Sequence, residues 1–251
     1  MIILKSKREI DGMKVAGEIL AACHREIARF IQPGVTTWEI DEFVEGFLTK
    51  NRAVPAQKGY KGYEYATCAS INDEICHGFP RKKPLLSGDI VTVDMVVNYN
   101  GSLADSAWSY AVGDVSKDVC KLLVVTKAAL YKGIEQARIG NRIGDIGHAI
   151  QTYVEEEGFS VVRDFIGHGI GASIHEKPDI PHFGHSGKGI RIKEGMVFTI
   201  EPMVNMGSYH LKMDSNRWTA RTVDGKYSAQ YEHTIAITKD GPVILTDQGL
   251  N

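Results

Sequence analysis

Hydrophobic positions in the first fifty residues recur at the spacing of an α-helix. The residues SKRE at positions 6–9 have the pattern of a capping box, which marks the start of a helix. The apolar positions that follow at helical spacing are Ile10, Met13, Leu20, Ile27 and Phe30. A Pro-Gly pair at residues 33–34 ends this predicted helix. A second capping pattern, Thr36 with Glu39, opens a helix that runs to about Asn51.

Further along the chain, helical and strand-like patterns are mixed. We predict helices from Ser116 to Gly140 and from about Ile143 to Gly158. The strand-like runs, bounded by Gly and Asn, are DIVTVDMVVNYNG (89–101), SLADSAWSYAVG (102–113), GMVFTIEPMV (195–204) and YEHTIAIT (231–238). No low-complexity segment or long Pro- and Ser-rich linker divides the chain. The pattern therefore predicts one α+β domain over residues 1–251.

Composition narrows the class of protein. A hydrophobic content of 43% and a net charge of −2 are ordinary for a globular protein and do not favour nucleic acid or an anionic membrane as partner. The four cysteines form no CxxC pair, which argues against a zinc ribbon and fits free thiols in a reducing compartment. The first residues, MIILKSKREIDGMK, contain no apolar stretch long enough for export, and no run approaches the roughly 18 apolar residues of a membrane helix. We expect a cytoplasmic protein that binds neither a membrane nor a specific nucleic acid.

Two segments of the chain echo each other. GDIVTVD (88–94) and GMVFTIE (195–201) each begin with Gly, alternate apolar residues with Thr, and end on an acid, Asp94 or Glu201. Each segment precedes another strand-like run with an acid, Asp105 in the first case and Glu232 in the second. The echo predicts two related halves, each with two carboxylates on neighbouring strands.

The four acids allow two interpretations. A solvated sheet face or strand end explains any one of them alone. All four together point to a shared centre, where carboxylates are costly unless they are paired or bind metal. Two divalent cations would balance four carboxylates and a neutral imidazole, and two ions roughly 3.5–4 Å apart can activate water and polarise a carbonyl. Oxygen ligands with one imidazole favour Mn, Fe, Co or Zn.

The stretch IGHGIGASIHEKPDIPHFGH (166–185) holds four of the nine histidines: His168, His175, His182 and His185. Such density suggests metal or proton chemistry, because imidazole is a common ligand and titrates near neutral pH. Gly167 and Gly169 flank His168 and would permit unusual backbone angles or close approach of other groups. Local spacing does not decide which histidine takes part.

Several motifs together carry a family resemblance. They are SINDEICHGFP, the Asp94 and Asp105 pair, FIGHGIGASIHEKP, FTIEPMV and SAQYEHT. With these motifs the chain resembles bacterial type I methionine aminopeptidases over nearly its whole length. The resemblance implies the pita-bread fold shared with prolidases and creatinase, in which a curved, largely antiparallel sheet of two pseudo-symmetric halves is covered by helices. It also implies that the protein removes the N-terminal methionine from nascent polypeptides whose second residue is small. The enzyme would be a monomer that acts in the cytoplasm, and one version of this expectation places it at the ribosome.

The resemblance implies a role for each motif residue. The metal ligands are Asp94, Asp105, His168, Glu201 and Glu232, with Asp105 and Glu232 bridging two divalent ions. Glu201 is the implied proton shuttle. His175 contacts the substrate carbonyl oxygen, and His77 lies near the scissile nitrogen.

The methionine pocket follows from the same resemblance. Its implied members are Tyr60, Tyr63, Cys68, His77, His175 and Trp218. Two positions depart from relatives, Ile174 in place of a Phe and Gln57 in place of a Cys. Some relatives also bind a monovalent cation through backbone carbonyls that match those of Asn72, Glu74 and Ser228.

The other histidines have no implied role. We predict that they lie on the surface or in loops: His24, His148, His182, His185, His210 and His233.

Three competing classes share the fold. Prolidases and aminopeptidase P normally add a large N-terminal domain, which we do not expect because the first helix begins by residue 7. Type II methionine aminopeptidases carry an extra helical segment in the second half, whereas only 31 residues separate Glu201 from Glu232. A non-catalytic binding module would have lost ligands that are all present here.

Overall fold

The computed structural model describes residues 2–249. Its helices are α1 (Lys7–Phe30), α2 (Thr37–Lys50), α3 (Lys117–Gln136) and α4 (Ile143–Glu156). Both predicted capping boxes are present, at Ser6 and at Thr36. α3 ends four residues before the predicted Gly140, because the backbone leaves helical geometry at Ala137 (ψ 58°) and turns at Gly140 with a φ of 100°.

The first half of the chain forms one antiparallel sheet. Its strands are β1 (Val54–Pro55), β2 (Cys68–Ile71), β4 (Ile90–Tyr99) and β5 (Ser102–Ala111), and the short 3-10 helix η1 (Tyr60–Gly62) lies between β1 and β2. β4 pairs with β1 and β2 along one edge and with β5 along the other. The two predicted runs at 89–101 and 102–113 are the hairpin β4–β5, which turns at Asn100 and Gly101, both with positive φ.

The second half contains a five-stranded antiparallel sheet with the order β15-β14-β9-β7-β8. Its strands are β7 (Gly167–Gly169), β8 (Glu176–Ile180), β9 (Val197–Ile200), β14 (His233–Thr238) and β15 (Gly241–Ile244). The predicted strand at 195–204 is interrupted at Pro202, which has no backbone N–H for a ladder, so that β9 ends at Ile200 and β10 (Met203–Asn205) is a separate strand. The predicted run at 231–238 becomes a strand only at His233, and Glu232 precedes it.

Two three-stranded sheets complete the strands. One has the order β13-β10-β6 and the other β11-β12-β3. Their strands are β3 (Glu74–Cys76), β6 (Ser160–Val161), β10 (Met203–Asn205), β11 (Leu211–Met213), β12 (Ala220–Thr222) and β13 (Ser228–Gln230). Because β12 pairs with β3, the second of these sheets joins the two halves of the chain.

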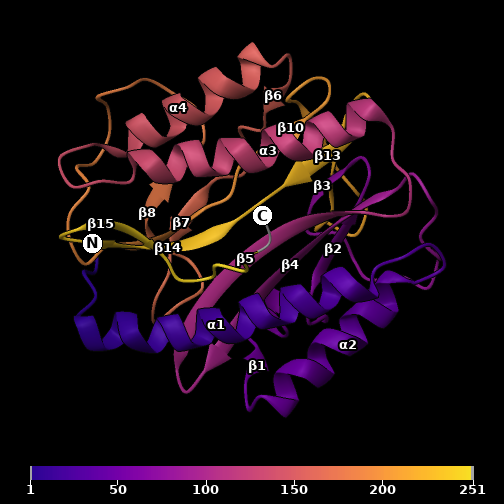
Figure 1. Ribbon diagram of the computed structural model, residues 1–251, viewed down its shortest axis with the longest axis horizontal. Helices are drawn as coiled ribbons and strands as arrows, with labels where there is room; N and C mark the ends of the chain where they lie inside the picture. The colour runs from indigo at the N-terminus through magenta and orange to yellow at the C-terminus, as the bar shows by residue number, and fades with distance from the viewer. Residues whose placement is uncertain (1, 250–251) are drawn as a thin grey trace.

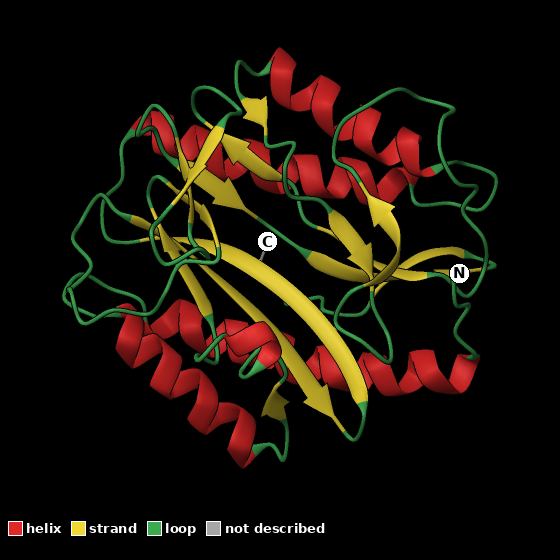
Figure 2. Ribbon diagram, turned by 180° about the vertical axis from the view of Figure 1, so that it is seen from behind, coloured by secondary structure: helices red, strands yellow, loops and turns green. Residues whose placement is uncertain are grey.

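The helices lie along the outside of the two halves. α1 packs on β4 and β5, whereas α3 packs on β9, β10 and β13 (Figure 1). The opposite view shows the strands in front of the helices, with the long hairpin β4–β5 crossing the middle (Figure 2). None of the four helices within residues 2–249 has the length and apolar character that a membrane crossing requires.

β5 connects the halves through hydrogen bonds. The backbone N–H of Asp105 donates to Thr234 Oγ1 at 3.0 Å, and the N–H of Glu232 donates to the carbonyl of Ala107 at 2.8 Å. One hydrophobic cluster also contains residues of both halves, among them Leu20 of α1 and Phe198 of β9. The junction is therefore held by backbone, hydroxyl and apolar contacts together.

Candidate metal centre and active site

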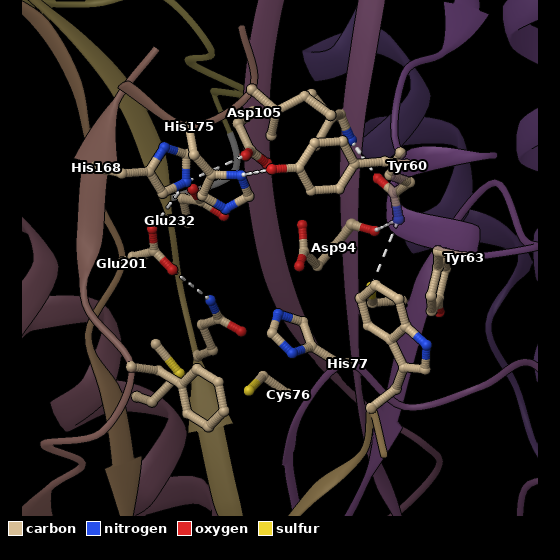
Figure 3. Close-up of a pocket in the computed structure, with 18 of the residues that line it drawn as sticks. Tyr60, Tyr63, Cys76, His77, Asp94, Asp105, His168, His175, Glu201 and Glu232 are labelled. Carbon is tan, nitrogen blue, oxygen red and sulfur yellow. Dashed lines mark hydrogen bonds and ion pairs between the residues drawn. The ribbon is translucent and has the colours of Figure 1, made fainter. Parts of the chain in front are cut away.

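Four acids meet where the halves join. Asp94 and Asp105 are diagonal neighbours on one face of the β4–β5 ladder. Glu201 follows β9 and Glu232 precedes β14, and one further step of that register sets them opposite each other. Figure 3 shows the carboxylates of the two halves facing one another, with His168 beside them.

His168 presents a neutral ring nitrogen to the acids. Its Nδ1 lies 3.0 Å from the carbonyl of Gly169, which can only accept, so Nδ1 carries the proton. Its Nε2 lies 3.7 Å from Asp105 Oδ2 and 3.5 Å from Glu201 Oε1. Burial, followed by the nearby His175, lowers the pKa of His168 to about 4. Ligand atoms of Asp105, His168 and Glu232 all lie within 4.8 Å of one another.

The glycines beside His168 serve close packing rather than an unusual backbone angle. A Cβ added to Gly167 would lie 2.5 Å from the carbonyl oxygen of Thr199. One added to Gly169 would lie 2.5 Å from the carbonyl oxygen of Lys177. β7 can therefore lie between β8 and β9 only with glycine at both positions.

The hydroxyl of Thr199 forms hydrogen bonds with both Glu201 and His168. Its hydroxyl donates to Glu201 Oε1 at 2.6 Å and accepts from the backbone N–H of His168 at 3.0 Å. The Thr that precedes the acid in the repeated segment thus orients both a carboxylate and the imidazole-bearing strand.

Burial dominates the electrostatics of the acids. It raises the pKa of Asp94 to about 7, and burial with the charge of Asp94 raises the pKa of Glu201 to about 8. The pKa values of Asp105 and Glu232 are raised well above their usual range by burial and then by repulsion from the other acids. Within residues 2–249, Asp105 Oδ1 and Glu232 Oε1 are buried without a hydrogen-bond partner. Buried oxygens that repel one another and lack donors fit divalent cations, which would supply the missing positive charge.

The acids open into one cavity of about 350 Å³. Every predicted catalytic, pocket and metal-binding residue lines it: Tyr60, Tyr63, Cys68, His77, Asp94, Asp105, His168, His175, Glu201, Trp218 and Glu232. The rings of Tyr63 and Trp218 meet edge to face with centroids 5.0 Å apart. The two departing positions, Gln57 and Ile174, also line the cavity. The residues predicted from the sequence therefore line one cavity.

His175 and His77 approach this cavity from different segments. His175 Nδ1 lies 3.0 Å from the hydroxyl of Tyr60, and burial with the positive charge of Lys61 lowers the pKa of His175. His77 has a φ of 56°, a left-handed conformation that is uncommon outside glycine. Burial lowers the pKa of His77 to about 4.

Gln57 does more than fill space. Its side chain accepts from the N–H of Val96 at 2.6 Å and donates to the carbonyl of Asp94 at 3.3 Å. It also lies 3.6 Å from Cys68 Sγ, as a donor. The residue therefore supports the backbone of an acid as well as the pocket wall.

The prediction that six histidines lie on the surface or in loops is wrong for two, His24 in α1 and His233 in β14, whereas His182 lies in a loop but is buried. His148, His185 and His210 are exposed, as predicted. His24, His182 and His233 are fully buried. His182 Nε2 accepts from the backbone N–H of Glu201 at 3.1 Å, a contact between residues on different segments that no local pattern signals.

Comparisons with known proteins agree with this geometry. The model of metallopeptidase family M24 matches residues 11–239. Methionine aminopeptidase 1 of Bacillus subtilis is 50% identical over 246 residues, which cover 98% of this chain and 99% of that protein. The crystal structure of methionine aminopeptidase from Rickettsia prowazekii has a TM-score of 0.97 at 44% identity and covers 98% of this chain and 100% of its own.

Prolidases are more distant. The prolidase from Pyrococcus furiosus has a TM-score of 0.76 at 24% identity, and the match covers 98% of this chain and 65% of that one. This likeness shows the shared fold alone, so the prolidase alternative is not favoured. The resemblance and fold inferred from the motifs are confirmed: the chain belongs to the metallopeptidase family M24, in which its close relatives are methionine aminopeptidases.

Proposed function

We propose that this protein is a metal-dependent aminopeptidase that removes methionine from the N-termini of nascent polypeptides whose second residue is small. The observation that carries the proposal is the cluster of buried acids and one neutral imidazole at the end of a largely apolar cavity. The names of the close relatives supply the substrate.

The metal ligands in this proposal are Asp94, Asp105, His168, Glu201 and Glu232. Asp105 and Glu232 would bridge two divalent ions, Asp94 would hold one of them, and His168 with Glu201 the other. Four carboxylates and one imidazole suit Mn, Fe, Co or Zn. Such ions, when bound, activate water and polarise the scissile carbonyl.

The side chains around the centre would orient the substrate and move protons. When the Tyr60 hydroxyl donates to His175 Nδ1, the ring keeps its proton on Nε2, which can donate to the substrate carbonyl oxygen as negative charge develops there. Glu201 would take the proton of the attacking water, and His77 would lie beside the departing nitrogen. The low pKa of His77 keeps that ring neutral at pH 7.

The pocket residues Tyr60, Tyr63, Cys68 and Trp218 would hold the methionine side chain. A closed pocket discriminates by about 1–3 kcal/mol per methylene, so peptides that begin with Leu should react more slowly. Ile174 lacks the ring that some relatives have and would leave more room at one wall.

Other features belong to the same proposal. The hydrophobic cluster shared by both halves supports a single catalytic domain over residues 1–251. A monovalent cation could bind the carbonyls of Asn72, Glu74 and Ser228; the buried hydroxyl of Ser228 has no partner within residues 2–249. In this proposal the protein is a monomer and acts in the cytoplasm on chains that leave the ribosome.

A peptide assay tests the core of this function. Metal-loaded protein should release methionine from Met-Ala-Ser but leave acetyl-Met-Ala-Ser intact, because a free α-amine is needed beside Asp94. Mass spectrometry after equal exposure reads both peptides. Efficient cleavage of the acetylated peptide, or full activity of chelator-stripped protein, would contradict the proposal.

A further inference from the structure

A buried ion pair connects the segment before α1 to the active-site loop. Lys5 Nζ lies 2.6 Å from Glu176 Oε2, and the two side chains are only 4% and 10% exposed. The backbone N–H of Lys5 also donates to the carbonyl of Gly195 at 2.6 Å. The extended segment is thus fixed to the second half by both its backbone and its side chain.

Glu176 uses its second oxygen to hold the loop that precedes β8. Oε1 accepts from the backbone N–H of Ala172 at 2.7 Å and from that of Ser173 at 3.2 Å. The residues enclosed by these bonds include Ile174 and His175, which both line the catalytic cavity. The Glu176 carboxylate therefore binds both this loop and Lys5, so that a shift of Lys5 would move the loop.

Lys5 also packs directly on this loop. Gly171 lies directly under the lysine, and a Cβ added there would be 2.3 Å from both Cε and Nζ of Lys5. Ala172 and Ser173 are exposed, so that Ile174 is the main apolar anchor of the loop. Lys5 consequently packs directly against the loop at Gly171.

We infer that Lys5 is a positioning residue for His175: through Glu176 it sets where the imidazole stands relative to Tyr60 and His168. The ring centroids of His168 and His175 are 4.2 Å apart, and His175 Nδ1 lies 3.0 Å from the Tyr60 hydroxyl. A displacement of about 1 Å at such a group can slow a reaction by as much as 100-fold. This inference rests on the proposed role of His175 at the substrate carbonyl.

The alternative is that Lys5 only stabilises the fold and does not position His175. Removal of one partner from a buried ion pair leaves an uncompensated charge, so any variant here should also unfold more easily. Kinetics of the folded protein distinguish the two, because a structural role lowers the melting temperature without changing kcat or KM well below it.

The test uses metal-loaded protein and Met-Ala-Ser at a temperature where every variant is folded. Lys5→Met should lower kcat on the order of 10- to 100-fold with a smaller change in KM. Lys5→Arg, which keeps the charge, should recover most of that loss. The matched control is Lys7→Met, because Lys7 forms an exposed pair with Asp11 at 2.9 Å and should not affect turnover. Hydrogen exchange at the amides of Ala172 and Ser173 should quicken in Lys5→Met alone.

Wild-type kcat and KM in folded Lys5→Met would overturn the inference. If Lys5→Met does not fold, Gly171→Ala decides by the same criterion, because its added Cβ displaces the lysine head without removing a charge. His175→Ala separates this question from the proposed function. If His175→Ala retains wild-type turnover, the role of His175 is wrong; if only Lys5→Met and Gly171→Ala do, the positioning role alone is wrong.

Discussion

The two halves of the molecule hold their acids by different means. Asp94 and Asp105 lie inside ten-residue strands, where the antiparallel ladder continues on both sides of each residue. Glu201 and Glu232 lie just beyond the ends of strands β9 and β14. The first pair is oriented by regular backbone pairing, whereas the second pair begins where that pairing stops.

Side chains replace the missing ladder in the second half. Glu201 is held by the hydroxyl of Thr199, by the amide of Gln230 at 3.4 Å, and through its N–H by His182. The carbonyl of Glu232 accepts from Ser106 Oγ at 3.0 Å. We therefore expect changes to single supporting side chains to affect function more in the second half than in the first.

The largest effect should come from the acids themselves and should be equal in both halves. Asp105→Ala and Glu232→Ala each remove a proposed bridge between two ions, so turnover of Met-Ala-Ser should fall by well over about 100-fold. Asp11→Ala, at an exposed acid on α1, is the control and should leave turnover unchanged. A loss below tenfold in either acid variant would remove that residue from the centre.

Metal removal should weaken the junction between the halves. Ions that bind only the folded state stabilise it by about 2.7 kcal/mol at a hundredfold excess over Kd. For a chain of this size that corresponds to a melting temperature higher by roughly 5–10 °C. Thermal unfolding with chelator and with added Mn or Co measures the shift. Equal melting temperatures for verified metal-free and metal-loaded protein would count against ligation by these acids.

The contrast between local strand pairing and support from distant side chains also explains which features the sequence could predict. The strand-like runs that become β4 and β5 and the two capping boxes are local patterns, and the structure confirms all of them. The prediction of one continuous strand over 195–204 is wrong at Pro202, although a proline within an apolar run is itself a signal for such a break. The four acids that meet at the junction of the halves are identified by the repeat and the family motifs together.

Side chains that support the acids from distant positions could not be predicted in the same way. His182 acts on a backbone group 19 residues later, and Gln57 acts on one 37 residues later. Such contacts depend on how the turns that follow β8 and β1 lie relative to β9 and β4, and no period or spacing in the chain encodes them. Burial of His24 and His233 was missed for the same reason.

His182 offers a direct test of the difference between the halves. His182→Leu removes the acceptor for the N–H of Glu201 and should lower turnover by about 10- to 100-fold, as well as weaken metal binding. His182→Asn offers another acceptor and should retain more activity. Calorimetric titration with Mn and steady-state kinetics measure the two effects. His185→Leu, three residues further on and exposed, is the control. If His182→Leu matches it, the Glu201 backbone needs no such support.

His24 is the corresponding buried histidine beneath the sheet of the first half. Its substitution should change the stability of the fold rather than turnover, and the effect should be smaller than that of His182→Leu. Its Nε2 donates to the carbonyl of Ser106 at 3.2 Å from α1, and burial lowers its pKa from 6.5 to about 3. Between these two pH values the unfolded chain binds a proton at His24 that the folded protein does not, so the wild type loses stability as pH falls below 6.5. His24→Gln cannot take up that proton, and from pH 6.5 to 5.5 it should lose about 1 kcal/mol less than the wild type. Urea unfolding at both pH values measures the difference, with exposed His148→Gln as the control.

Turnover of His24→Gln at pH 7.5 should stay near that of the wild type, because the ladder of β4 and β5 holds Asp94 and Asp105 without it. A turnover loss as large as that of His182→Leu would show that the first half depends on single side chains as much as the second.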